Sequence, residues 1–248
     1  MKRIWRGFTL IELLVVIGII GLLMAILVPM LEHGREQAMQ VKCANNLHQI
    51  GYAISMYANA NNGAYPRTTY VADAPLTQGT AAAAPDPFAT GGPAANDVTA
   101  AEFLLIRTQQ MPTVVFTCPY NDVIQYVFDP AIAPQSRSNF SDFRKNLGYS
   151  FANPYPGSAL VRTGYQLSTH LNPAFVVAAD LNSGLGGDQN SPNHEDRGQN
   201  VLFADSHVEW ASSPKVGIRE DNIYTNKAGV AGGIPIDASD TVLLPLQK

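Results

Sequence analysis

Residues 8–28 read FTLIELLVVIGIIGLLMAILV, and Glu12 is the only charged residue in this run. A short basic segment, residues 1–7, precedes it, and the apolar character continues to Leu31. Its length is close to the ~20 residues that a helix needs to cross a bilayer. We therefore expect a transmembrane helix over about residues 10–31. A carboxylate inside such a segment is costly unless it is paired, so Glu12 is a candidate functional residue.

The N-terminal segment differs from a cleaved secretory signal. The apolar run is longer than the core of a usual signal peptide, and no small-residue cleavage site follows Pro29. Because the leading segment is positively charged, the positive-inside rule places it in the cytoplasm and exports the rest of the chain. A plain single-pass anchor, with Glu12 near the headgroups, is the alternative interpretation.

The junction Gly7-Phe8-Thr9-Leu10-Ile11-Glu12 resembles the cleavage site of type IV prepilins and of the pseudopilins of type II secretion. The resemblance implies that prepilin peptidase removes residues 1–7 as a leader and that Phe8 is then N-methylated. Glu12 becomes the fifth residue of the mature chain. During filament assembly it would pair with the α-amine of Phe8 in an adjoining subunit, since an unpaired buried charge is destabilising.

The helical pattern resumes beyond Pro29 and predicts one long helix over residues 8–61. Its second half is amphipathic, with Gly63 suited to the C-terminal cap. The apolar stripe comprises Cys43, Leu47, Ile50, Ile54 and Tyr57. Gly18, Gly21 and Pro29 are candidate points of helix flexibility. The alternative is the ordinary tolerance of membrane helices for glycine and proline.

Residues 62–248 are expected to form an exported globular domain that begins with a long loop, residues 67–98, rich in Ala, Thr, Pro and Gly. Thr99 and Glu102 match a capping box at the start of a short helix. Short β-branched and aromatic runs then predict strands. They are 114–117, 124–128, 147–151, 175–179, 201–204 and 207–210. The fold class is α+β, with the long helix packed on an antiparallel sheet as in type IV pilins.

A second resemblance lies near the C-terminus. The segment from His194 to Trp210 is similar to the His-x9-Asp-Gly signature of a large group of bacterial pseudopilin-like proteins, to which the residues around Cys43 also point. Here ten residues separate His194 from Asp205, and Ser206 replaces the glycine. Asp205 and Ser206 are expected to form a hairpin turn, and the serine indicates a longer or different turn than Asp-Gly would make.

Two further sites are open to alternatives. Cys43 and Cys118 lack CxxC partners, which argues against a zinc knuckle. In an exported domain the two cysteines are expected to form a disulfide, and two buried free thiols are the alternative.

Major pseudopilins of type II secretion bind calcium in an acidic C-terminal loop, which suggests Asp180, Asp188 and Asp196 as Ca²⁺ ligands. A solvated polar turn is the alternative, and no other cofactor is expected.

The net charge and the missing motifs argue against two other functional classes, nucleic-acid-binding proteins and enzymes. The formal net charge is −4, which argues against a nucleic-acid surface. The sequence has no G-x-S-x-G, H-E-x-x-H or P-loop motif, so we do not expect an enzyme.

These features predict a structural subunit of a type IV pilus or of a type II secretion pseudopilus. Its expected partners are identical subunits in a helical filament, the prepilin peptidase/N-methyltransferase, the inner-membrane assembly platform and the lipid bilayer. It would move from the inner membrane into an extracellular or periplasmic filament. The alternatives are a minor pseudopilin that primes a secretion pseudopilus and a membrane-tethered binding protein that never polymerises.

Overall fold

The computed structural model describes residues 8–128 and 133–246, so the expected leader, residues 1–7, lies outside the described part. The chain divides into two compact units, Met1–Met39 and Gln40–Lys248. Helix α1, Leu10–Ala60, begins in the first unit and ends in the second. The predicted long helix is confirmed.

The first unit is an exposed apolar helix. Every described residue up to Arg35 is exposed. Among the described residues, α1 is the helix long and apolar enough to cross a membrane by length and composition, with a mean hydropathy of 3.0 in its most apolar window. A helix that is apolar all round needs apolar surroundings, either lipid or other helices.

In the second unit, the predicted stripe of α1 is buried: Cys43, Leu47, Ile50, Ile54 and Tyr57 are each at most 8% exposed. The helix ends in a left-handed turn at Asn62, with φ of 53°, and Gly63 donates its N–H to the carbonyl of Ala58 at 2.8 Å. This bond satisfies a carbonyl that the end of the helix would leave without a partner.

Five antiparallel strands form the main sheet, in the order β4-β3-β2-β1-β7, and β5 and β6 form a two-stranded sheet. The strands are β1 (Tyr149–Ala152), β2 (Val176–Asp180), β3 (Gln199–Phe203), β4 (Val208–Ala211), β5 (Lys215–Gly217), β6 (Asp221–Asn222) and β7 (Leu243–Leu244). The last four predicted strand runs therefore correspond to β1 to β4. The expected α+β class, a long helix followed by an antiparallel sheet, is confirmed.

The remaining helical elements are short. They are α2 (Val98–Gln109), η1 (Thr113–Phe116), η2 (Pro134–Ser136), α3 (Phe143–Asn146), α4 (Ser158–Val161) and η3 (Asn193–Asp196).

Two of the predicted strands are wrong. Residues 114–117 lie mostly in the 3₁₀ helix η1, which buries the adjacent side chains of Val115 and Phe116 while Val114 stays exposed. Residues 124–128 are extended without a strand partner. In both places the β-branched composition was outweighed by tertiary context, as is common for strand propensities.

The predicted capping box at Thr99 is also wrong. Asp97 is the N-cap of α2, and its carboxylate accepts a hydrogen bond from the N–H of Ala100 at 2.9 Å. The same carboxylate accepts from the N–H of Thr80 at 2.9 Å, so one side chain ends the irregular loop and starts the helix. Glu102 is instead buried, and neither of its oxygens has a hydrogen-bond partner in the described structure.

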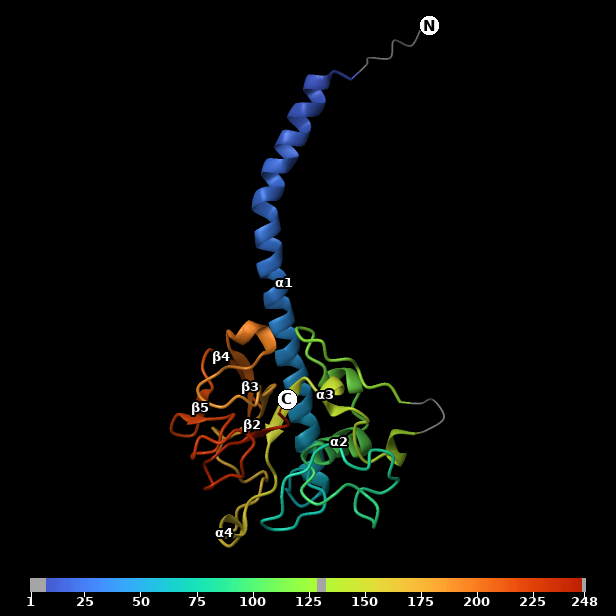
Figure 1. The fold of residues 1–248 in the computed structure, drawn as a ribbon, viewed down its shortest axis with the longest axis vertical. Helices are drawn as coiled ribbons and strands as arrows, with labels where there is room; N and C mark the ends of the chain where they lie inside the picture. Colours follow the sequence, from blue (N-terminus) through green and yellow to red (C-terminus); the bar gives the residue numbers. More distant parts are fainter. Residues whose placement is uncertain (1–7, 129–132, 247–248) are drawn as a thin grey trace. The chain divides into compact units, whose positions relative to one another are not determined.

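The core lies on both sides of the C-terminal part of α1, between the sheet and the segment that contains α2 and α3 (Figure 1). The helix approaches the sheet closely at Gly51. A Cβ atom added there would lie 3.0 Å from Cδ1 of Leu202 on β3. A side chain at this position would therefore push the helix away from the sheet.

We predict that Gly51→Leu lowers the free energy of unfolding by about 1–3 kcal/mol, the usual cost of overpacking a core. Urea unfolding of the full chain in detergent would measure it. Gly34→Leu is the matched control, because Gly34 is in the same helix and has no atom within 4 Å of an added Cβ. Equal effects of both substitutions would contradict the close approach.

Glu102 gives a second prediction. Burial, reinforced by the charge of Asp97, raises the pKa of Glu102 well above its ordinary value. Above about pH 4.5 the unfolded chain loses this proton while the folded chain keeps it, so stability falls by up to ~1.4 kcal/mol per pH unit until the folded pKa is reached. Glu102→Gln removes this loss. Its stability advantage over the wild type, from urea unfolding, should be larger at pH 8 than at pH 5.

The control for this experiment is Glu209→Gln, which alters an exposed carboxylate on β4. Its effect should be the same at both pH values. A Glu102→Gln advantage that does not grow with pH would mean that the buried carboxyl is not neutral in the folded protein.

Candidate functional site

The candidate functional residues lie in two places, the start of α1 and a buried cluster at the sheet. Gly7 lies outside the described residues, and Phe8 is 73% exposed. Thr9 and Glu12 form a reciprocal cap on α1. The carboxylate of Glu12 accepts from the N–H of Thr9 at 2.8 Å and from its hydroxyl at 2.6 Å, and the N–H of Glu12 donates back to that hydroxyl at 3.3 Å. This is the capping box that the sequence analysis missed, although Thr-x-x-Glu is its usual signal.

The three proposed flexibility positions lie within an unbroken helix. α1 runs through Gly18, Gly21 and Pro29, and both glycines are open, with nothing within 4 Å of an added Cβ. Unwinding of this segment on assembly stays a prediction.

The signature turn joins β3 to β4 with a wider loop than Asp-Gly would form. The N–H of Phe203 donates to the carbonyl of His207 at 3.0 Å, and the N–H of Ser206 donates to the carbonyl of Phe203 at 2.9 Å. Ser206 has φ of 73°, a left-handed conformation that favours glycine. The turn is thus a three-residue loop whose last residue takes the position of the signature glycine.

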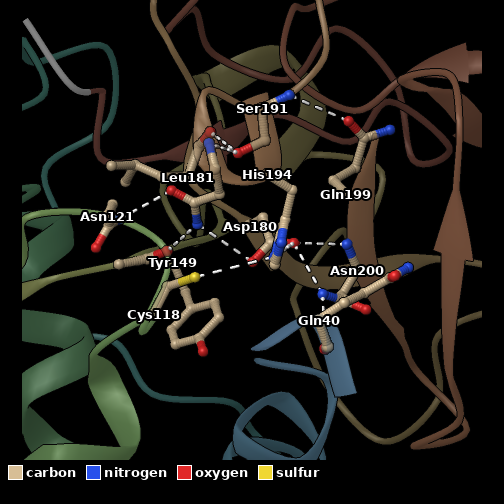
Figure 2. A network of polar contacts seen from close by, with 12 residues as sticks. Gln40, Cys118, Asn121, Tyr149, Asp180, Leu181, Ser191, His194, Gln199 and Asn200 are labelled. Atoms are coloured by element: carbon tan, nitrogen blue, oxygen red, sulfur yellow. Dashed lines mark hydrogen bonds and ion pairs between the residues drawn. The ribbon is translucent and has the colours of Figure 1, made fainter. Parts of the chain in front are cut away.

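His194, the other end of the signature, is buried in a cluster with Cys43, Cys118 and Asp180. One potential ligand atom from each of the four side chains lies within 4.8 Å of the other three. Nε2 of His194 is 3.4 Å from Oδ2 of Asp180 and 3.9 Å from Sγ of Cys118. Figure 2 shows the side chains of Cys118, Asp180 and His194 pointing toward one another.

Four separate segments supply this cluster. Cys43 comes from α1, Cys118 follows η1, Asp180 is the last residue of β2, and His194 is in η3 before β3. Gly148, just before β1, lets the segment of Cys118 lie close to the sheet, because a Cβ on it would lie only 2.5 Å from the backbone nitrogen of Cys118.

Hydrogen bonds fix the carboxylate of Asp180 at the centre of this network (Figure 2). Oδ2 accepts from the backbone N–H of Asn200 at 2.6 Å and from its side-chain amide at 3.1 Å. Oδ1 accepts from the side-chain amide of Asn193 at 3.2 Å. The amide of Asn200 also donates to the carbonyl of Gln40 at 3.4 Å, which links the sheet to α1.

The backbone around His194 is strained. His194, Glu195 and Asp196 have φ values of 57°, 57° and 58°, and none of them is glycine. A left-handed conformation costs a residue with a side chain roughly 1–2 kcal/mol. Rings of Tyr120 and Trp210 pack on the imidazole, with centroids at 4.9 and 5.4 Å. The strain and the packing together hold Nε2 toward the cysteines and Asp180.

The four groups also alter one another's protonation. A hydrogen bond from Cys118 lowers the pKa of the Cys43 thiol to about 7, and the same bond raises the pKa of Cys118. Burial lowers the pKa of His194, but its hydrogen bonds to Asp180 and Cys43 outweigh burial and raise the pKa to about 9. The cluster therefore lowers the cost of a thiolate at Cys43 and of an imidazolium at His194.

One expectation is corrected by this arrangement, and calcium binding stays a prediction. Cys43 and Cys118 are free thiols in the structure, in place of the expected disulfide. The three proposed calcium ligands are not gathered within the described residues. Asp180 is buried in the cluster, Asp188 forms an exposed ion pair with Lys215, and Asp196 is exposed.

The N-terminal motif is matched by comparison with known proteins. The prokaryotic N-terminal methylation motif matches residues 6–28. The chain is 40% identical over 91 residues to type II secretion system core protein G of Aeromonas hydrophila, covering 37% of this chain and 63% of that protein. It is 36% identical over 82 residues to the protein of the same name from Vibrio cholerae, covering 32% of this chain and 56% of that protein.

The similarity is therefore confined to part of each protein, and the chain spans less than two thirds of the length of these relatives. No solved structure matches the chain at a significant level. The chain carries the prepilin-type methylation motif and is homologous to core protein G. Its long N-terminal helix and antiparallel sheet are consistent with the type IV pilin-like α+β fold.

The turn at Ser206 gives a prediction. Ser206→Gly removes the penalty of the left-handed conformation and should raise the free energy of unfolding by about 1 kcal/mol. Ser212→Gly is the control. Ser212 is exposed and has no positive φ, so glycine there should lower stability slightly through the entropy of the unfolded chain. Thermal unfolding of the full chain in detergent measures both. A destabilised Ser206→Gly variant would contradict the turn geometry.

Proposed function

We propose that this protein is a structural subunit of a pseudopilus-like filament of the type II secretion kind. Before assembly its N-terminal helix anchors it in the inner membrane with the leader in the cytoplasm. The observation that carries the proposal is the coincidence of the methylation motif, residues 6–28, with an exposed apolar helix that starts at Leu10. The names of the relatives, all core proteins of a secretion system, fit a non-enzyme.

The physical basis is the exposed part of α1. From Leu13 to Leu31 its side chains are apolar on all sides, so they are stable only in lipid or among other apolar helices. A subunit that leaves the bilayer must replace the lipid around this helix. Identical helices from neighbouring subunits provide that replacement, which makes polymerisation the natural route out of the membrane.

Glu12 has a different partner in each state of this scheme. In the single subunit, Thr9 supplies two hydrogen bonds to its carboxylate, which lowers the cost of keeping the charge at the start of the helix. Cleavage before Phe8 creates an α-amine beside this site. In the filament, that amine of a neighbouring subunit supplies the positive charge that a carboxylate between packed helices requires.

The experiment separates the charge of Glu12 from its capping role. Glu12→Gln keeps the cap, because a glutamine also completes a capping box, but removes the charge. Thr9→Ala removes the cap but keeps the charge. We expect Glu12→Gln and Glu12→Ala to lower subunit-to-subunit cross-linking and the sheared filament fraction at least about tenfold. Thr9→Ala should retain most of the assembly, at a cost of ~1 kcal/mol in helix stability.

Two measurements accompany the assembly readout. Immunoblots of inner membranes check that each variant reaches wild-type levels, and intact mass checks the loss of residues 1–7 and the methyl group on Phe8. Normal filaments of Glu12→Gln would refute the charge pair. A wild-type subunit found only in trace amounts in the filament would indicate a minor, priming pseudopilin. An uncleaved N-terminus on the exported protein would indicate a tethered binding protein instead.

A further inference from the structure

We propose that Cys43, Cys118, Asp180 and His194 form a structural zinc site in the globular domain. The proposal is independent of the filament function, since it concerns how the domain is held together. The four side chains are at most 1% exposed, and one potential ligand atom of each lies within 4.8 Å of the other three.

The residue types fit zinc. Two thiolates, one imidazole nitrogen and one carboxylate oxygen are all donors that Zn²⁺ accepts, and four protein ligands form the closed tetrahedral shell of a structural site. Sulfur donors argue against calcium, which takes oxygen ligands in larger numbers. The set also differs from a zinc knuckle, because no two ligands are neighbours in sequence.

The distances fit a tetrahedral shell. With metal–ligand bonds of ~2.0–2.3 Å, neighbouring donors in a tetrahedron lie about 3.3–3.8 Å apart. Nε2 of His194 is already 3.4 Å from Oδ2 of Asp180 and 3.9 Å from Sγ of Cys118. Binding would require shifts of at most about 1–1.5 Å within the cluster.

The surroundings hold the ligands in place for such a role. Two N–H groups of Asn200 bind Oδ2 of Asp180, and the amide of Asn193 binds Oδ1, which is the kind of outer hydrogen bonding that orients metal ligands. Nδ1 of His194 is buried without a partner in the described residues, so this ligand lacks the outer hydrogen bond that most metal-bound histidines make.

The strained backbone around His194 also supports a metal site. Three consecutive residues, His194 to Asp196, are left-handed where the chain presents the imidazole to the cluster. Such strain persists where the structure around it requires that geometry, and it gathers at functional sites. A disulfide would use both sulfurs but would not account for Asp180 and His194 meeting at the same point.

The test uses the full chain, purified in detergent without chelators. Elemental analysis should find about one zinc per chain, the stoichiometry of one closed site. Cys43→Ser and Asp180→Asn should lose stoichiometric zinc, whereas His170→Gln, which alters an exposed histidine outside the cluster, should keep it. Asn200→Ala should weaken zinc binding by about 10–100-fold, because it removes one outer hydrogen bond to Asp180.

A second measurement covers the case in which the ligand variants fail to fold. The wild-type chain, stripped of metal under reducing conditions and loaded with Co²⁺, should show strong visible bands of tetrahedral cobalt and a thiolate-to-cobalt charge-transfer band. Weak octahedral spectra, or zinc content unchanged in Cys43→Ser, would overturn the proposal. Thiol titration of unfolded, unreduced protein that finds no thiols would overturn it as well, in favour of the disulfide.

Discussion

The burial of one face of α1 against the sheet is the contact on which the globular domain depends. The stripe from Cys43 to Tyr57 is removed from water, and the bare backbone at Gly51 lets the helix approach Leu202 of β3. Because a helix has one rotational setting for a given buried face, this contact also decides where every other residue of α1 points. Cys43 faces the sheet for this reason, while Val41 and Tyr52 stay exposed. The same helix thus has one face packed in the core of the domain and another face in contact with solvent.

Much of this fold could be predicted from sequence because its signals are local. The helix shows in its 3.6-residue period, and β1 to β4 show in their β-branched and aromatic runs. The failures share a cause. Residues 114–117 have strand composition but find no strand partner, and Thr99 precedes a glutamate but loses the cap to Asp97, which also holds the loop through Thr80. In each case a distant contact outweighed a local preference.

The two candidate sites also differ in whether their residues are close together in sequence. The residues around Phe8 and Glu12 are neighbours in sequence, so a motif could identify them. The buried cluster takes its members from α1, the segment after η1, the end of β2 and η3, and the tertiary packing of these segments brings them together. In the sequence, His194 belongs to a signature and the cysteines form a pair, but no spacing rule joins these three residues to Asp180. The partnering of Asp180 with Asn193 and Asn200 was likewise invisible in the sequence.

The position of Cys43 has a mechanical consequence. Along the described part of α1, it is the first residue whose side chain is buried. Tension applied along this helix from its N-terminal end therefore reaches the folded domain at the carbonyl of Gln40 and the buried side chain of Cys43, before it reaches Leu47 or Ile50. The cluster that surrounds Cys43 connects the helix to β2 and η3 at that first point of load. When the domain is pulled by its helix, the cluster would therefore hold the helix to the sheet at the point where the pulling force first acts.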